Sequence, residues 1–70
     1  MMPLSMAKTG MTTNIKKITG KDETKRHLEN LGFVPGEDVI VISEISGDLI
    51  INIKGSRIAI NRSMAMRIMI

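Results

Sequence analysis

The spacing of apolar residues along the chain changes period, and these changes divide the chain into three parts. Residues 11–20 are rich in threonine and isoleucine and end in glycine, which is typical of a strand. A shorter strand through Leu4 and Met6 is expected before it. Residues 21–32 have helical spacing, and after residue 38 the aliphatic residues return to strand spacing. The pattern therefore predicts strands, then one helix, then strands.

The segment KDETKRHLENLG predicts a helix of about ten residues. Thr24, His27, Leu28 and Leu31 fall at positions i, i+3, i+4 and i+7 and so share one face. Asp22 suits the N-cap position, where its carboxylate accepts a hydrogen bond from a free amide of the first turn. Because so short a helix is not stable alone in water, we expect packing of its leucines to hold it in place.

The residues LGFVPG predict the end of this helix and a reversal of the chain. Gly32 fits the left-handed C′ position, which makes Phe33 the C″ residue and Leu28 the C3 residue of a Schellman motif. Pro35 prevents the helix from continuing. Residues 34–37 fit a type II turn, with proline second and glycine third, where φ is positive. The segment is therefore expected to turn the chain into a strand.

The last part of the chain predicts four short strands separated by minimal turns. The strands are expected at residues 38–45, 49–54, 57–60 and 65–70, and the turns at residues 46–48, 55–56 and 61–64. The first strand is nearly continuous aliphatic, as in a strand covered on both faces for part of its length. The second strand alternates and places Leu49, Ile51 and Ile53 on one face.

Short antiparallel strands with one helix cannot form a flat open sheet without exposing a large aliphatic face. A small, strongly bent barrel with the helix covering one opening avoids this exposure. We therefore expect a mainly β fold with one short helix, an SH3-like barrel of about five to six antiparallel strands. An OB-like barrel is the alternative. The length of 70 residues predicts a single domain over residues 1–70.

Composition adds that packing must supply the stability. Hydrophobic residues make up 43% of the chain, and because there is no cysteine, disulfides and thiolate metal ligands are excluded.

The N-terminus lacks the features of a signal peptide, and the longest aliphatic run, residues 39–42, is too short to cross a bilayer. We therefore expect a protein that is neither secreted nor inserted in a membrane.

Charges are segregated along the chain. All seven acidic residues lie between Asp22 and Asp48, while residues 1–21 and 49–70 carry basic residues only. If both ends met in the fold, they would form a basic side suited to an anionic partner; ordinary solvated strand edges are the other interpretation. The calculated pI of 9.7 keeps a small basic barrel that binds nucleic acid as an alternative function. However, Phe33 is the one aromatic residue available to stack on bases.

The residue types needed for catalysis are scarce. There is no cysteine or tyrosine, and His27 is the one histidine, so we do not expect an enzyme. His27 is interpreted as a helix residue whose ring packs beside the core. Glu23 and His27, at positions i and i+4, are weak candidate metal ligands because they offer only two groups. Met64, Met66 and Met69 fit either core filler or a partner surface.

The segment HLENLGFVPGEDVIVI, followed by GSRIAINRSMAMRI, resembles the ferrous iron transport protein A family. The opening PLSMAKTG is similar too, so the resemblance covers nearly the whole chain; residues 61–63 depart from the family pattern. The residues that match the family pattern in order are Leu28, Leu31, Gly32, Pro35, Gly36, Val39, Gly55, Ile58, Ala59, Ile60, Ala65 and Ile68. The same domain is found at the C-terminus of iron-dependent repressors.

This resemblance implies a non-enzymatic accessory protein of bacterial ferrous iron uptake, located in the cytoplasm at the inner face of the plasma membrane. The implied partner is the membrane iron permease with its GTP-binding domain. Neither a small-molecule substrate nor nucleic acid is implied as a ligand of this protein. The same analogy implies transition metal binding, with Fe²⁺ as the ion. It does not imply a resident cofactor. The candidate partner-binding residues are His27, Leu31, Phe33, Val34, Pro35 and Gly36.

Overall fold

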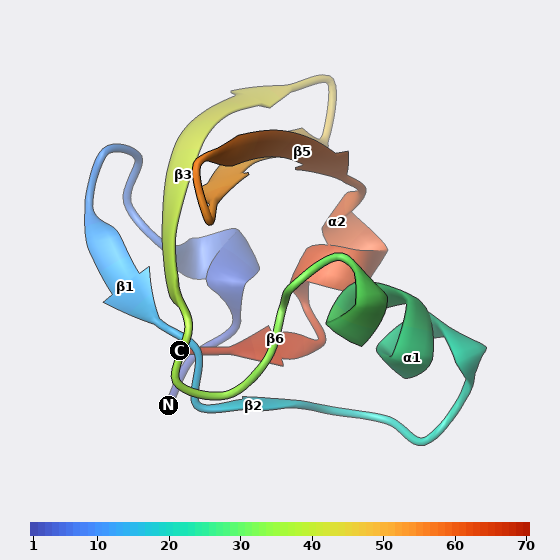
Figure 1. Cartoon of the computed structure of the whole chain (residues 1–70). Helices are drawn as coiled ribbons and strands as arrows, with labels where there is room; N and C mark the ends of the chain where they lie inside the picture. The colour runs from blue at the N-terminus through green and yellow to red at the C-terminus, as the bar shows by residue number, and fades with distance from the viewer.

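The computed structural model describes residues 1–70 as a mainly β fold of two antiparallel sheets. The elements in chain order are η1 (Leu4–Met6), β1 (Thr12–Asn14), β2 (Lys17–Ile18), α1 (Glu23–Asn30), β3 (Asp38–Ile45), β4 (Asp48–Ile53), β5 (Ser56–Ile60), α2 (Arg62–Ala65) and β6 (Ile68–Met69). One sheet has the strand order β1-β3-β4-β5, and β2 pairs with β6 in the other. Figure 1 shows β3 arching over the molecule, with β1 on one side and both helices on the other. The expected small SH3-like architecture is confirmed.

The N-terminal third differs from the predicted strands. The strand expected over residues 11–20 is divided into β1, which pairs with β3, and β2, which pairs with β6. Between them Ile15 is 1% exposed, and its amide donates to the carbonyl of Glu37 at 2.9 Å. The chain therefore passes from one sheet to the other at this residue. The strand expected through Leu4 and Met6 is wrong, because these residues form the 3-10 turn η1, which buries Leu4.

Local capping signals define both ends of α1. The Asp22 carboxylate accepts from the amide of Lys25 at 3.3 Å, which confirms the predicted N-cap. At the other end, Gly32 has φ of 105°, and the amide of Phe33 donates to the carbonyl of Leu28 at 3.0 Å. This bond, with that from Gly32 to the carbonyl of Glu29, completes the predicted Schellman motif. The helix is slightly shorter than expected.

The predicted Pro-Gly turn is also confirmed. The amide of Glu37 donates to the carbonyl of Val34 at 3.1 Å, and Gly36 has φ of 92°, as a type II turn requires. The turn is braced from outside by the preceding strand region. The Gly36 amide donates to the carbonyl of Ile15 at 2.8 Å, and the Asn14 side-chain amide donates to the Gly36 carbonyl at 2.8 Å. The turn is therefore fixed to the four-stranded sheet.

The two hairpins of the larger sheet have two-residue turns. Ser46 and Lys54 both have φ of 51°, and each precedes a glycine of positive φ, which is the pattern of a type I′ turn. Leu49, Ile51 and Ile53 are at most 3% exposed, which confirms the predicted inward face of β4.

The outer face of β3 is covered for only part of its length, as expected: Ile40 is half-buried, whereas Ile42 is 36% exposed. The pairing of β3 with β4 shifts register between Val41 and Ser43, so Ile42 lies in a bulge. The aliphatic run in the sequence gives no signal for this irregularity.

The end of the chain closes the smaller sheet beside the N-terminus. The turn expected at residues 61–64 is replaced by the short helix α2. The Asn61 side chain caps this helix and accepts from the Met64 amide at 2.8 Å. The expected strand over 65–70 is reduced to β6. Met2 and Ile70 exchange two backbone hydrogen bonds of 3.0 and 2.8 Å, which joins the two termini (Figure 1).

The core is a single cluster of 13 buried residues, all of them hydrophobic. Its members are Leu4, Ile15, Ile18, Leu28, Phe33, Val39, Val41, Leu49, Ile51, Ile53, Ile60, Ala65 and Ile68. Of the methionines, Met64 packs against this core, as expected for core filler, whereas Met66 is 56% exposed. One buried residue of α1, Leu28, anchors the helix to the barrel.

Candidate functional site

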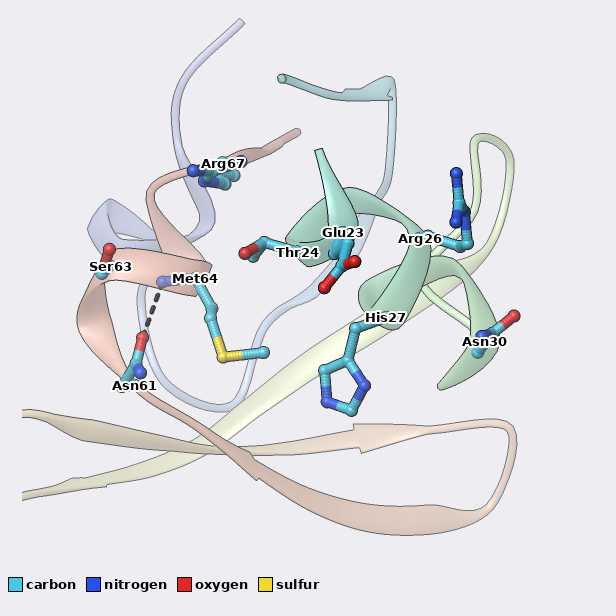
Figure 2. A pocket seen from close by; sticks show the side chains of 9 residues that line it. All are labelled: Glu23, Thr24, Arg26, His27, Asn30, Asn61, Ser63, Met64 and Arg67. Atoms are coloured by element: carbon cyan, nitrogen blue, oxygen red, sulfur yellow. Dashed lines mark hydrogen bonds between the residues drawn. The ribbon is translucent and has the colours of Figure 1, made fainter. Parts of the chain in front are cut away.

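An open cleft of about 590 Å³ lies between α1 and the segment from Asn61 to Arg67. Of its nine lining residues, only Met64 is apolar. Figure 2 shows Glu23 and His27 projecting from α1, and Met64 projecting from α2 toward them. The residues that line the cleft are Glu23, Thr24, Arg26, His27, Asn30, Asn61, Ser63, Met64 and Arg67. An open and polar cleft of this kind suits a surface contact better than an enclosed apolar ligand.

One ion pair ties the two sides of the cleft together. The Arg67 Nη1 atom donates to the Asp22 carboxylate at 2.7 Å, so the N-cap of α1 is joined to the segment before β6. The Arg67 carbonyl accepts from both the amide and the hydroxyl of Thr19, at 2.8 and 3.2 Å. At Gly20, with φ of 97°, a Cβ atom would lie 2.6 Å from Arg67 Nη1. Glycine at this position therefore leaves the space that the guanidinium occupies.

This ion pair gives a pH dependence with a definite sign. The Arg67 hydrogen bond holds the pKa of Asp22 below its usual value of 3.8. A lowered folded-state pKa stabilises the fold above the unfolded-state value, and this contribution is lost as the pH falls through the folded-state pKa. We expect D22N, which keeps a capping oxygen but has no charge, to be less stable than the natural protein at neutral pH.

The thermal unfolding temperatures of both proteins, measured from about pH 6 down to about pH 2, check this expectation. The difference between them should shrink below about pH 4, because only the natural protein then loses the Asp22 charge. Two curves that stay parallel over this whole range would show that the ion pair does not contribute to stability.

The predicted partner-binding residues lie on or next to the C-terminal half of α1. His27, Pro35 and Gly36 are exposed, and Leu31 and Val34 are half-buried. Phe33 is different: it is 0% exposed and belongs to the core. Its side chain is therefore not available to a partner, and its inclusion among the contact residues is corrected, because the C″ position of the Schellman motif turns it inward.

The helix position of His27 suggested that its ring packs beside the core, but this interpretation is wrong. His27 is exposed and lines the cleft together with Glu23 (Figure 2). These two side chains supply two ligands, whereas structural zinc sites use four. No group of three or more histidine, aspartate or glutamate side chains is placed to hold a metal ion. The residues present therefore do not fit a resident metal.

The segregated charges are partly neutralised by the fold. Lys54 lies 3.6 Å from Glu37, and Arg67 pairs with Asp22, so basic residues of the later part of the chain meet the acidic middle. Phe33, the one aromatic residue, is buried and so offers no stacking surface to a base. Neither the length nor the hydrophobicity of any helix in the structure reaches what a membrane-spanning helix needs.

Sequence reasoning missed the cleft and the residues on its far side. Asn61, Ser63 and Arg67 are separated from α1 by three strands, and only the fold brings them opposite it. A signal for part of this was present: asparagine three residues before Met64 is a helix N-cap pattern. No local signal pairs Asp22 with Arg67, which are 45 positions apart.

The fold and this surface define a class: a small SH3-like domain with an exposed helix and a braced Pro-Gly turn. The model of the FeoA domain family matches residues 2–70. This chain therefore belongs to the FeoA family. It is 40% identical over 70 residues to a protein of Methanocaldococcus jannaschii named "Putative Fe(2+) transport protein A", covering all of this chain and 85% of that one.

Solved structures agree with this assignment. An iron uptake regulatory protein (FeoA) superposes with a TM-score of 0.87 at 30% identity, covering 96% of this chain and 89% of its own. Zinc-complexed FeoA of Stenotrophomonas maltophilia, described as a procaryotic SH3 domain protein, gives 0.87 at 25% identity, covering 99% and 88%. The IdeR protein of T. acidophilum shares the fold, with a TM-score of 0.83 at 24% identity, and this chain matches 31% of it.

Proposed function

We propose that this protein is a non-enzymatic accessory protein of ferrous iron uptake that docks on the cytoplasmic GTP-binding domain of the membrane iron permease. The match of the FeoA model to residues 2–70 supports the connection with iron transport. It works in the cytoplasm and reaches the inner face of the plasma membrane through this partner. Ferrous iron is the cargo of the transport system.

The observation that carries the docking proposal is a fixed, mixed apolar and polar surface at the end of α1. This docking surface consists of His27, Leu31, Val34, Pro35 and Gly36. Leu31 packs partly against the core and remains half-exposed, so it offers apolar area without leaving the fold. A surface that is already ordered before binding loses less conformational entropy on association.

Two braces make the docking surface rigid. The Schellman motif fixes the end of α1. The Pro-Gly turn is fixed by two hydrogen bonds of Gly36, whose carbonyl accepts from the Asn14 side chain and whose amide donates to the Ile15 carbonyl. Lys54 and Glu37, paired at 3.6 Å, lie beside this turn, and the Lys54 stem approaches Gly32. The surface therefore has an apolar centre with a charged border, as protein interfaces commonly do.

The proposal is tested by titrating ¹⁵N-labelled protein with the cytoplasmic domain of the permease, with and without guanine nucleotide. We expect saturable amide shift changes at His27, Leu31, Val34 and Gly36. L31S should weaken binding about tenfold, as loss of a central apolar contact does. I45S, at a residue that is 60% exposed on the β3–β4 hairpin, is the matched control and should bind normally.

Circular dichroism of both variants shows whether they are folded, so that a lost contact is separated from a lost fold. The absence of any saturable shift change in every nucleotide state would refute docking on this domain.

A further inference from the structure

The outer edge of β5 has backbone groups without a hydrogen-bond partner. Ile53 pairs with Ser56 across the two-residue turn, so Ser56, Ile58 and Ile60 direct their amides and carbonyls toward β4. The intervening residues, Arg57 and Ala59, direct theirs away from it. Neither residue takes part in any backbone hydrogen bond outside the sheet ladders, and both are exposed. β5 is the last strand of its sheet (Figure 1).

The side chains along this edge of β5 are also only partly covered. Ile58 faces inward and pairs with Ile51, which is 0% exposed, but Ile58 itself is only half-buried. Arg57, on the outer face, has no acidic partner, because the salt bridges of the structure use Lys54 and Arg67. An added strand would satisfy the backbone groups and cover Ile58.

We propose that this edge pairs with the same edge of a second copy of this chain, antiparallel and two-fold symmetric about Ile58. In this register Arg57 of one copy and Ala59 of the other exchange both of their backbone hydrogen bonds, and the symmetric pair does the same. All four free groups of each edge are then used. Ile58 lies opposite Ile58 of the second copy, so each covers the half-buried face of the other.

The residue types fit this register and no like charges meet directly. Arg57 lies opposite Ala59 of the second copy, which places its aliphatic stem over a small apolar side chain. A neighbouring register that placed arginine opposite arginine would be destabilised. Each copy has a net charge of +3, so association should strengthen as salt screens the repulsion.

The pairing is weak because only one short edge is buried. A contact well below the usual interface area, held by four backbone hydrogen bonds, has a dissociation constant of about 1 mM. It involves this chain alone and so does not depend on the proposed docking. Where a binding partner gathers several copies, the high local concentration favours it.

A charge exchange at Ala59 tests the register. A59E places a carboxylate opposite each Arg57 of the second copy and should tighten the dimer about fivefold, and A59K should weaken it about fivefold. The same changes at the exposed loop residue Thr9, T9E and T9K, alter net charge equally and should have much smaller effects. Sedimentation equilibrium up to about 2 mM protein measures the constants.

Amide hydrogen exchange gives a second readout at the edge itself. The exchange of the Arg57 and Ala59 amides should slow as the concentration of the natural protein rises, with no change at Asn52 within the sheet. Equal responses to charge at Thr9 and Ala59 would overturn the proposal, and so would a protein that stays monomeric with concentration-independent exchange. Protection of these amides only after the permease domain is added would assign the edge to a strand of that partner instead.

Discussion

Replacement of Phe33 by alanine should lower the free energy of unfolding by about 3–5 kcal/mol, the range for deletion of a buried aromatic ring. Phe33 is 0% exposed and is the one aromatic side chain of the protein. No other residue of the core can fill the space of a phenyl ring without moving the barrel. A domain of this size has a total stability of only about 4–10 kcal/mol, so F33A should lose a large part of it.

Urea unfolding followed by circular dichroism measures this loss. V34A is the matched control, because Val34 is the half-buried neighbour on the docking surface and should lose about 1 kcal/mol or less. A loss below about 1 kcal/mol for F33A would mean that the ring is accessible and available to a partner after all.

This expectation separates two roles within the segment LGFVPG. Leu31, Val34, Pro35 and Gly36 present side chains or backbone at the surface, whereas Phe33 acts from below by fixing the end of α1. Under the proposed docking, a change at Phe33 would weaken binding by moving the whole surface, and a change at Leu31 would remove a proposed contact and leave the fold in place.

The elements predicted correctly from the sequence are those set by nearby residues. The Asp22 cap, the Gly32 helix end and the type II turn at Gly36 each depend on about six neighbouring positions or fewer. A glycine and the aliphatic alternation beside it also specify both hairpins, but the turns lie at residues 46–47 and 54–55 rather than at the expected 46–48 and 55–56. For these segments local preference and tertiary structure agree.

The elements predicted wrongly are those that a distant partner decides. Residues 11–20 have the composition of one strand, but burial of Ile15 between two sheets divides it. Leu4 and Met6 alternate as in a strand, yet the 3-10 turn places Leu4 in the core. The four residues of α2 are too few to produce a helical period.

The candidate site shows the same division. The helix end and the turn that carry the proposed docking surface were predicted correctly, because both depend on nearby residues. The exposure of His27 was not predicted, because His27 lies at the border of the apolar face and only Leu28 is buried from α1. The cleft opposite His27 needs Asn61 and Arg67, which only the path of the three intervening strands places there.

Replacement of Leu28 by alanine should lower the free energy of unfolding by about 2–5 kcal/mol. Leu28 is 0% exposed and is the single buried residue of α1, which is too short to be stable without it. We therefore expect L28A to lose helical signal as well as stability. L31A, at the half-buried leucine one turn later, should lose clearly less. A loss below about 0.5 kcal/mol for L28A would place this side chain on the surface.

The double variant L28A/F33A tests whether these two residues act as one unit. The carbonyl of Leu28 accepts from the amide of Phe33 at 3.0 Å, and both side chains belong to the same core cluster. Once either side chain is truncated, α1 is no longer held in place, so truncation of the second side chain should remove less free energy of unfolding. We expect the combined loss to be smaller than the sum of the single losses by about 0.5–3 kcal/mol, as for residues in contact. Because two such losses can exceed the total stability, the cycle is best measured in a stabilising osmolyte. Strict additivity would mean that the helix is held at Leu28 independently of its Schellman end.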